Sequence, residues 1–261
     1  TANSSYGKYA ASDYNNRTAQ RSIYETEHRF FATASSTHYF LGADKPTTFN
    51  LYFERKSGLP GTYSWDTYTS RNYGGTAYQR EAFGYEKNLN DDSSHLLYVP
   101  SGVSDPNVCW GSCAAPDLAI AAQVLDTLYN KLGLQGYAGQ IVPNGVYEYP
   151  WRTSLDLKIT QILPGFRAED EFVISLGIMN LLNLLDSDKG EAKYGPYNGK
   201  MAVLDMYMNE DFTKYIYPNY KGRGYPDYAY GYNSSNPKGI RKSAVNSIWR
   251  AQLGFTYKFS F

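Results

Sequence analysis

The sequence lacks a long apolar run. No stretch of its 261 residues approaches the ~20 consecutive apolar residues that a membrane-spanning helix needs. It also lacks net charge, because 25 basic residues balance 25 acidic ones. A balanced charge gives no support for nucleic-acid binding. The composition therefore argues against a helical membrane protein and against a nucleic-acid-binding protein.

Residues with catalytic potential are scarce. The three histidines, His28, His38 and His95, are scattered, and no serine lies in a Gly-x-Ser-x-Gly motif. Asp91 and Asp92 precede His95 and would suit the acid and histidine pair of an outer-membrane hydrolase. Adjacent aspartates in an Asn- and Ser-rich loop are more often simply hydrated. We therefore predict that the chain is not an enzyme and keep a hydrolase as the least favoured alternative.

Cysteine is also rare, with only Cys109 and Cys113. Their spacing, beside Gly, Ser and Pro, suits a small disulfide loop in an oxidising compartment, and the alternative is two free thiols in a reducing one. A zinc site would need further His or Cys ligands nearby, and the sequence offers none. We expect the disulfide.

The last fifteen residues alternate strictly between apolar and mostly polar or small positions. This period of two is typical of a β-strand with two different faces, and its length exceeds the about 4–8 residues of an ordinary half-buried strand. A transmembrane β-strand needs about 9–11 residues with lipid-facing and lumen-facing side chains in alternation. We expect a lipid-facing stripe here, and the alternative is a long terminal strand of a soluble sandwich. The stripe is Trp249, Ala251, Leu253, Phe255, Tyr257, Phe259 and Phe261.

Four earlier stretches alternate in the same way. We place the five strands at about residues 27–36, 47–56, 152–162, 170–181 and 247–261. The intervening polar positions are expected to face inward. The earlier positions expected to face outward are Phe30, Ala32, Ala34, Phe49, Leu51, Phe53, Leu155, Leu157, Ile159, Phe172, Ile174, Leu176 and Ile178.

The connections between these strands alternate between short and long. Two short turns contrast with long connections over 57–150 and 184–246, and the first long connection contains a helix that opens at Pro116 and stops at Gly133. Outer-membrane barrels have short periplasmic turns and long extracellular loops. The pattern predicts an all-β, antiparallel transmembrane β-barrel in a bacterial outer membrane, with the C-terminus in the periplasm. Five strands do not close a barrel, so either strands are hidden in the loops or, as we favour, this is the C-terminal portion of a larger barrel.

Tyrosine is abundant, at 27 residues, and crowds both long connections. Tyr, Ser, Gly and Asn together make rigid contact surfaces with adaptable hydrogen bonding, which suits a ligand- or partner-binding rim outside the cell. The alternative is that the rings pack the loops against one another. The rim candidates are Tyr63, Tyr68, Tyr73, Tyr215, Tyr217 and Tyr220.

Seven motifs, in order, resemble the C-terminal part of TonB-dependent outer-membrane receptors of the Oar-like type, which carry a carboxypeptidase-regulatory-like domain at the N-terminus. The motifs span nearly the whole chain. They are EHRFFATAS (27–35), FNLYFERKSGLP (49–60), LLYVP (96–100), YAGQIVPNG (137–145), PWRTSLDLKITQ (150–161), NLLN (180–183) and WRAQLGFTYKFSF (249–261).

The resemblance implies a large barrel filled by a plug, with the plug and the segment that binds TonB lying upstream of this sequence. It also implies that Tyr257, Phe259 and Phe261 form the signal read by the barrel assembly machinery. Relatives carry a Gly-containing acidic run before LLYVP that suits calcium, but Asn90, Asp91 and Asp92 lie in a run without Gly. We therefore expect a solvated turn and no cofactor, with a calcium site at these residues as the less favoured alternative.

The expected function is that of a receptor or transporter with an unnamed ligand. Its partners would be outer-membrane lipid, the upstream barrel and plug, TonB, and an extracellular protein or peptide ligand or a surface partner. The alternative is a non-transporting surface protein whose barrel serves adhesion or anchors a partner.

Overall fold

The computed structural model describes residues 19–67, 95–167, 169–195, 199–209, 211, 213–218 and 239–259. Backbone contacts divide the chain into two compact units. Unit 1 is drawn from Thr1–Glu25, Leu59–Tyr149 and Gly195–Ile240, and unit 2 from Thr26–Gly58, Pro150–Tyr194 and Arg241–Phe261. Each unit therefore combines segments that lie far apart in the sequence.

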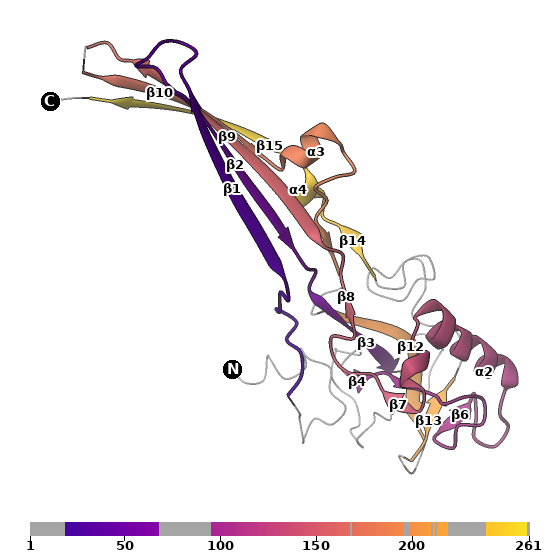
Figure 1. The fold of residues 1–261 in the computed structure, drawn as a ribbon. Helices are drawn as coiled ribbons and strands as arrows, with labels where there is room; N and C mark the ends of the chain where they lie inside the picture. The colour runs from indigo at the N-terminus through magenta and orange to yellow at the C-terminus, as the bar shows by residue number, and fades with distance from the viewer. Residues whose placement is uncertain are drawn as a thin grey trace. The chain divides into compact units, whose positions relative to one another are not determined.

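Unit 2 is built on one antiparallel sheet of five long strands. The strands are β1 (Arg29–His38), β2 (Thr47–Lys56), β9 (Arg152–Pro164), β10 (Glu171–Met179) and β15 (Arg250–Lys258). They are hydrogen-bonded in the order β1-β2-β9-β10-β15, so β1 and β15 form the edges (Figure 1). Strands are thus present at all five places where alternation predicts them.

The strand ends differ from expectation for local reasons. β15 begins at Arg250 rather than Ser247, because α4 (Ala244–Ser247) precedes it and Ser243 Oγ caps that helix by accepting from Asn246 N at 3.2 Å. β10 ends at Met179, because Asn180 has a left-handed backbone with a φ of 56° and α3 (Leu181–Leu185) follows.

The strand register places the alternating residues on two distinct faces. Cross-strand partners point to the same side of a sheet. Leu51 pairs with Ala34 and with Leu157, and Leu157 pairs with Ile178, which pairs with Ala251. This side is called the apolar face, and every outward position expected from the sequence in these strands lies on it. The other side, called the polar face, carries Thr33, Ser35, Asn50, Tyr52, Asp156, Lys158, Gly177 and Gln252.

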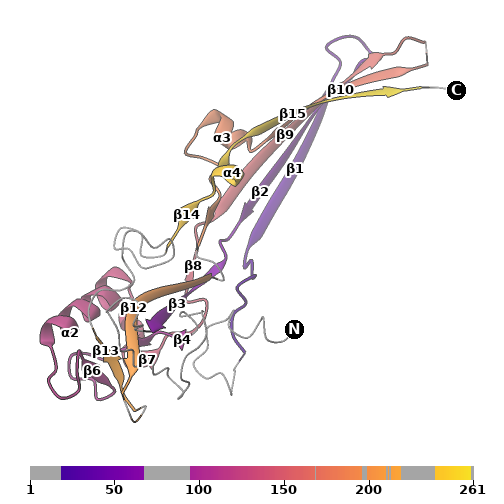
Figure 2. The same cartoon turned by 180° about the vertical axis from the view of Figure 1, so that it is seen from behind.

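The five strands form a single layer. In the described part of the chain, no helix covers either face over most of its length (Figures 1 and 2). The buried hydrophobic cluster of the molecule contains only residues of unit 1. Leu253 and Phe255 in the middle of β15 are 58% and 61% exposed. The sheet therefore has no hydrophobic core of its own.

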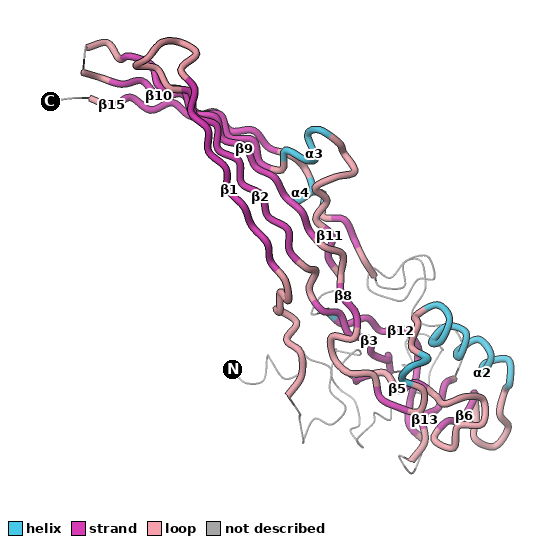
Figure 3. The backbone as a smooth tube through the Cα atoms, in the orientation of Figure 1, coloured by secondary structure: helices cyan, strands magenta, loops and turns pink. Residues whose placement is uncertain are grey.

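The two ends of the sheet differ in their connections. Short turns over 39–46 and 165–170 join β1 to β2 and β9 to β10 (Figure 3). At the opposite end, the connections over 57–151 and 180–249 leave and re-enter the sheet. These are called the short-turn end and the long-connection end.

Unit 1 corrects the interpretation of the long connections as loops with one helix. They contain β3 (Pro60–Thr67), β4 (His95–Leu96), β6 (Val108–Trp110), β8 (Tyr147–Glu148), β12 (Lys200–Met208) and β13 (Tyr215–Tyr217), which form one six-stranded sheet. Parallel pairing joins β3 to β12 and β6 to β13. Two small sheets pair β5 (Tyr98–Val99) with β7 (Gln140–Ile141) in unit 1, and β11 (Lys193–Tyr194) with β14 (Arg241–Lys242) in unit 2. None of these shorter strands joins the five-stranded sheet.

The helix expected after Pro116 is present in unit 1. Asp117 Oδ1 caps α2 (Leu118–Leu125) by accepting from Ala119 N at 2.8 Å. A π-helical turn (Asp126–Lys131) continues it, Gly133 ends it at a φ of 69°, and a 3-10 turn (Gln135–Tyr137) follows. Val124 and Leu128 pack into the core of unit 1. No helix in the described residues is long and apolar enough to cross a membrane.

Candidate functional site

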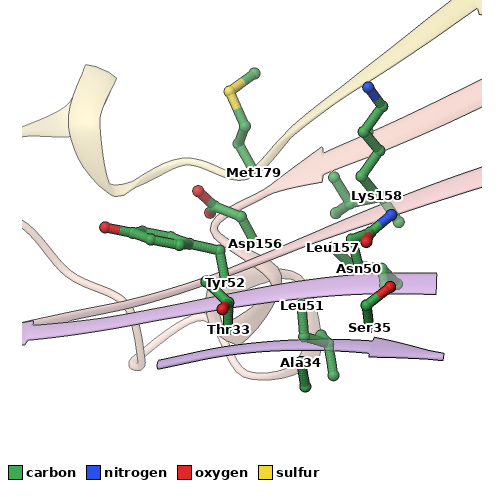
Figure 4. A pocket seen from close by; sticks show the side chains of 12 residues that line it. Thr33, Ala34, Ser35, Asn50, Leu51, Tyr52, Asp156, Leu157, Lys158 and Met179 are labelled. Atoms are coloured by element: carbon green, nitrogen blue, oxygen red, sulfur yellow. The ribbon is translucent and has the colours of Figure 1, made fainter. Parts of the chain in front are cut away.

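The polar face of the sheet holds a shallow groove of about 450 Å³. It crosses the middle of β1, β2 and β9 and the last three residues of β10, Gly177 to Met179. In Figure 4, Tyr52, Asp156, Lys158 and Met179 project to one side of the strands that carry them. Hydroxyl, amide, carboxylate and ammonium groups thus line one concave surface.

The two charged side chains of the groove differ in their partners. Asp156 Oδ1 accepts a hydrogen bond from Asn180 N at 2.8 Å. Lys158 makes no ion pair with any residue that the structure describes, which leaves its three N–H donors for another group. The groove therefore presents a lysine without an ion-pair partner and a carboxylate beside hydroxyls, an amide and apolar side chains.

Ion pairs close both ends of the polar face. At the long-connection end, Glu54 accepts from Arg29 at 2.6 Å and lies 3.5 Å from Lys56. At the short-turn end, Lys258 Nζ lies 2.9 Å from Glu171. The Arg29–Glu54 and Lys258–Glu171 pairs join adjacent strands, whereas Glu54 and Lys56 both belong to β2, and none of the three pairs lies on the apolar face.

The Asn180 side chain links the segments that follow β10 through hydrogen bonds to their backbone. Its Nδ2 donates to Gly190 O and to Ser247 O, each at 2.9 Å. Ser247 Oγ in turn accepts from Ala192 N at 2.9 Å. One buried side chain thus links the end of β10, the segment after α3 and the end of α4, just before β15. The left-handed backbone of Asn180 makes this geometry available, since Asn tolerates that conformation better than most residues.

Aromatic rings lie at both ends of the apolar face. At the short-turn end, Tyr257 packs 4.8 Å from Phe259 and 5.6 Å from Phe166. At the long-connection end, Trp151 stacks 6.2 Å from Phe30. Of the stripe expected to face lipid, Leu253, Phe255 and Tyr257 belong to the apolar face of β15, and Trp249 and Phe259 lie just beyond its ends, exposed by 41% and 66%. Phe261 lies outside the described residues.

The expectation that tyrosines of the long connections form an exposed binding rim is wrong for those buried in unit 1. Tyr63 and Tyr217 are only 2% and 0% exposed, and Tyr215 is half-buried. Tyr63 packs 4.5 Å from Tyr147, and Tyr215 stacks 4.5 Å from Tyr98. Rings in these positions pack the long connections together, which is the alternative that the sequence left open. Tyr68, Tyr73 and Tyr220 lie outside the described residues.

Burial governs the chemistry of these tyrosines. It raises the pKa of Tyr149 to about 12 and that of Tyr217 well above its ordinary value. Tyr147 Oη lies 3.2 Å from Tyr149 Oη, and Tyr217 Oη donates to Tyr98 O at 2.7 Å. The hydroxyls are therefore satisfied inside the core and remain protonated, as expected of structural residues.

The disulfide expected between Cys109 and Cys113 is present, with an S–S distance of 2.02 Å. It closes the segment between β6 and α2. Nearby, burial alone would raise the pKa of Asp105, but hydrogen bonds from Ser101 N and Asn107 N outweigh it and hold that pKa below its ordinary value. These contacts organise this part of unit 1.

The structure does not describe the side chains suggested for a calcium site or for a hydrolase. Asn90, Asp91 and Asp92 lie outside the described residues, as does the side chain of His95. His28 stacks 6.0 Å from Trp151, and His38 Nε2 lies 2.7 Å from Ser36 Oγ. The described residues contain no group of three His, Cys, Asp or Glu able to hold a metal ion.

Sequence reasoning missed two features of the sheet. Asn180 was visible only as the start of NLLN, and nothing in that motif identifies partners ten and 67 residues away. In the sequence, Arg55 looks like the polar end of an alternating strand. Its spacing of two and four residues from Phe53 and Leu51 could nevertheless have placed it on the apolar face.

Comparison with known proteins gives no match, whether with protein-family models, with curated proteins or with solved structures. What the sheet can do is therefore inferred from its own residues.

Proposed function

We propose that the chain is the C-terminal part of an outer-membrane β-barrel that serves as a TonB-dependent receptor or transporter. The observation that carries the proposal is the single-layer sheet with one apolar face exposed and one polar face grooved. A sheet in water must bury its apolar face against another layer. Contact with lipid removes that requirement, because the acyl chains themselves cover the apolar face.

The dimensions of the apolar face support the membrane assignment. Trp249 and Phe259 are ten residues apart. At ~3.3 Å per residue and a tilt of ~40°, this separation corresponds to about 25 Å along the membrane normal. That height equals the apolar band of outer-membrane barrels, which aromatic girdles flank on both sides.

The edges of the sheet support its place in a larger barrel. Among the described strands, β1 and β15 each pair on one side only. Unpaired N–H and C=O groups are too costly in lipid for an edge to stay open. In the proposal, strands encoded upstream pair with both edges, and the polar face lines the lumen.

The receptor assignment rests on the motif resemblance given above and on the lumen groove. Lys158 and Asp156 would face the plug or a passing ligand at mid-depth. The upstream plug and its TonB-binding segment would supply energy coupling.

Unit 1 favours a second candidate function. The long connections build a core of their own rather than independent loops, with Tyr63, Met201, Leu204 and Tyr217 among its buried members. A structured module carried by a barrel suits a surface protein that anchors a partner without transport.

Binding of TonB distinguishes the two functions. The full-length protein is extracted from membranes in detergent and tested against the purified periplasmic domain of TonB. A receptor binds this domain and loses binding when the segment upstream of the plug is deleted. A membrane-embedded protein that never binds TonB supports the anchoring function, and a full-length protein that is monomeric and soluble without detergent overturns both.

A further inference from the structure

One cation interrupts the apolar face. In the register, Arg55 pairs with Phe30 on one side and with Thr153 on the other, so it shares the face of Leu51 and Phe53. Among the strand residues of this face, Arg55 alone is an Arg or Lys. It lies at the long-connection end.

The Arg55 guanidinium lies against a cluster of aromatic rings, called the aromatic shelf, which consists of Trp151, His28 and Phe30. Its Cζ lies 5.4 Å from the centroid of the Trp151 ring, within the range of a cation–π contact. Trp151 also stacks with His28, at a centroid distance of 6.0 Å, and with Phe30, at 6.2 Å. The shelf therefore orients the guanidinium while it leaves the N–H edge of the group accessible.

No carboxylate of the described chain neutralises Arg55. Glu54, its neighbour in β2, points to the polar face and pairs with Arg29 and Lys56. Glu27 is the nearest acid to the shelf in sequence, and it lies 3.4 Å from His28 Nε2. An exposed Arg on an apolar surface without an acidic partner is suited to an external anion.

Resting on the proposed function, we propose that Arg55 and Trp151 bind the phosphate group of an outer-leaflet lipid. A guanidinium binds phosphate through two parallel N–H donors, and Trp places its ring at the level of lipid head groups. Phe30 lies beside Arg55, Phe53 and Leu51 continue the surface toward the middle of the sheet, and all three would contact the acyl chains. Among the described strand residues of this face, the short-turn end offers aromatic rings without an Arg or Lys, so in this proposal the site belongs to one leaflet.

The test uses the full-length protein in detergent and native mass spectrometry with a defined lipid pair, diphosphoryl lipid A and its dephosphorylated form. We expect the unsubstituted protein to prefer the phosphorylated lipid by about tenfold, the effect of one charge-assisted pair. Arg55→Gln is expected to abolish the preference, and Arg55→Lys to retain part of it. Arg152→Gln is the matched control, since Arg152 pairs with Lys56 on the polar face, and it should keep the full preference.

Three outcomes with the variants or with free phosphate would overturn the inference. These are an unchanged preference in Arg55→Gln, an equal loss in Arg152→Gln, and displacement of the lipid by millimolar inorganic phosphate, which would indicate a site for free phosphate. Trp151→Phe keeps a ring beside Arg55 and, where Arg55→Gln does not accumulate, is expected to reduce the preference.

Recovery of each variant in the outer-membrane fraction is scored separately. A protein that inserts without any lipid preference refutes only this inference, whereas failure of the unsubstituted protein to insert refutes the proposed function.

Discussion

Leu51 and Leu157 face each other across β2 and β9, and the next pair along, Asn50 and Lys158, lies on the opposite side of the sheet. Consecutive residues in these strands therefore meet different surroundings. In the proposed membrane setting, Leu157 contacts acyl chains and Lys158 faces the lumen.

This relationship predicts opposite accessibility for two adjacent labels. A spin label at Leu157→Cys in the full-length protein should be relaxed by oxygen, which concentrates in lipid, and little by a water-soluble nickel complex. A label at Lys158→Cys should not show the oxygen-dominated relaxation. Leu51→Cys and Asn50→Cys form a second matched pair one strand away. Nickel-dominated relaxation at both Leu157→Cys and Leu51→Cys would place the apolar face in water and exclude the membrane assignment.

Asn180 predicts a large local loss of stability. Asn180→Ala removes the donor to Gly190 O and Ser247 O and also places Ala at a φ of 56°. The buried Ser247 carbonyl left unpaired costs about 1–3 kcal/mol, the half-buried Gly190 carbonyl costs less, and the left-handed backbone adds about 1–2 kcal/mol. Asn180→Gly removes the same amide without the backbone cost, so it should be less destabilising than Asn180→Ala.

Hydrogen exchange of the segments after α3 and before β15 measures the effect. Asn183→Ala is the control, because Asn183 donates to Ser187 O and Lys189 O at an exposed position. Equal protection in Asn180→Ala and Asn183→Ala would contradict the role assigned to Asn180.

Alternation predicted the sheet well because its information is local. In β15, Leu253, Phe255 and Tyr257 identify a face without reference to any other segment, and the register then unites that face with Leu176, Ile174 and Phe172 of β10. The exact ends were less accessible, since Ser243 and Asn180 set them through capping and a left-handed turn.

Unit 1 was not predictable in the same way because its pairing is remote. Thr62 of β3 pairs in parallel with Lys200 of β12, across 138 residues, and no short pattern encodes such a contact. The tyrosine-rich composition around Tyr63 and Tyr217 fits both a packed core and an exposed rim. Only the positions of their partners distinguish the two.

The disulfide predicts a stability change confined to unit 1. Replacing both Cys109 and Cys113 by Ala releases a loop of five residues, and the chain-entropy relation gives a loss of about 2 kcal/mol. Limited proteolysis of the segment between β6 and α2 should quicken, while the five-stranded sheet keeps its protection. Reduction of the unsubstituted protein should have the same effect, and Ser112→Ala, within the same loop, should have little. Loss of protection in the sheet would mean that the two units do not unfold independently.

Tyr149 predicts an alkaline limit to the stability of unit 1. Burial raises its pKa to about 12, above the ~10 of an unfolded tyrosine, so the protonated form is favoured in the folded state. Its contribution is intact below about pH 10 and is lost as the pH rises toward 12, with a slope of about 1.4 kcal/mol per pH unit for one such group. Urea unfolding followed by near-ultraviolet circular dichroism between pH 9 and 12 measures the slope. Tyr149→Phe removes the titrating group and should flatten the slope by that amount, leaving the share due to other buried tyrosines such as Tyr147 and Tyr217, whose pKa values burial also raises. Tyr194→Phe, which removes an exposed hydroxyl, should leave the slope unchanged, and an equal flattening in both variants would show that burial of Tyr149 is not its cause.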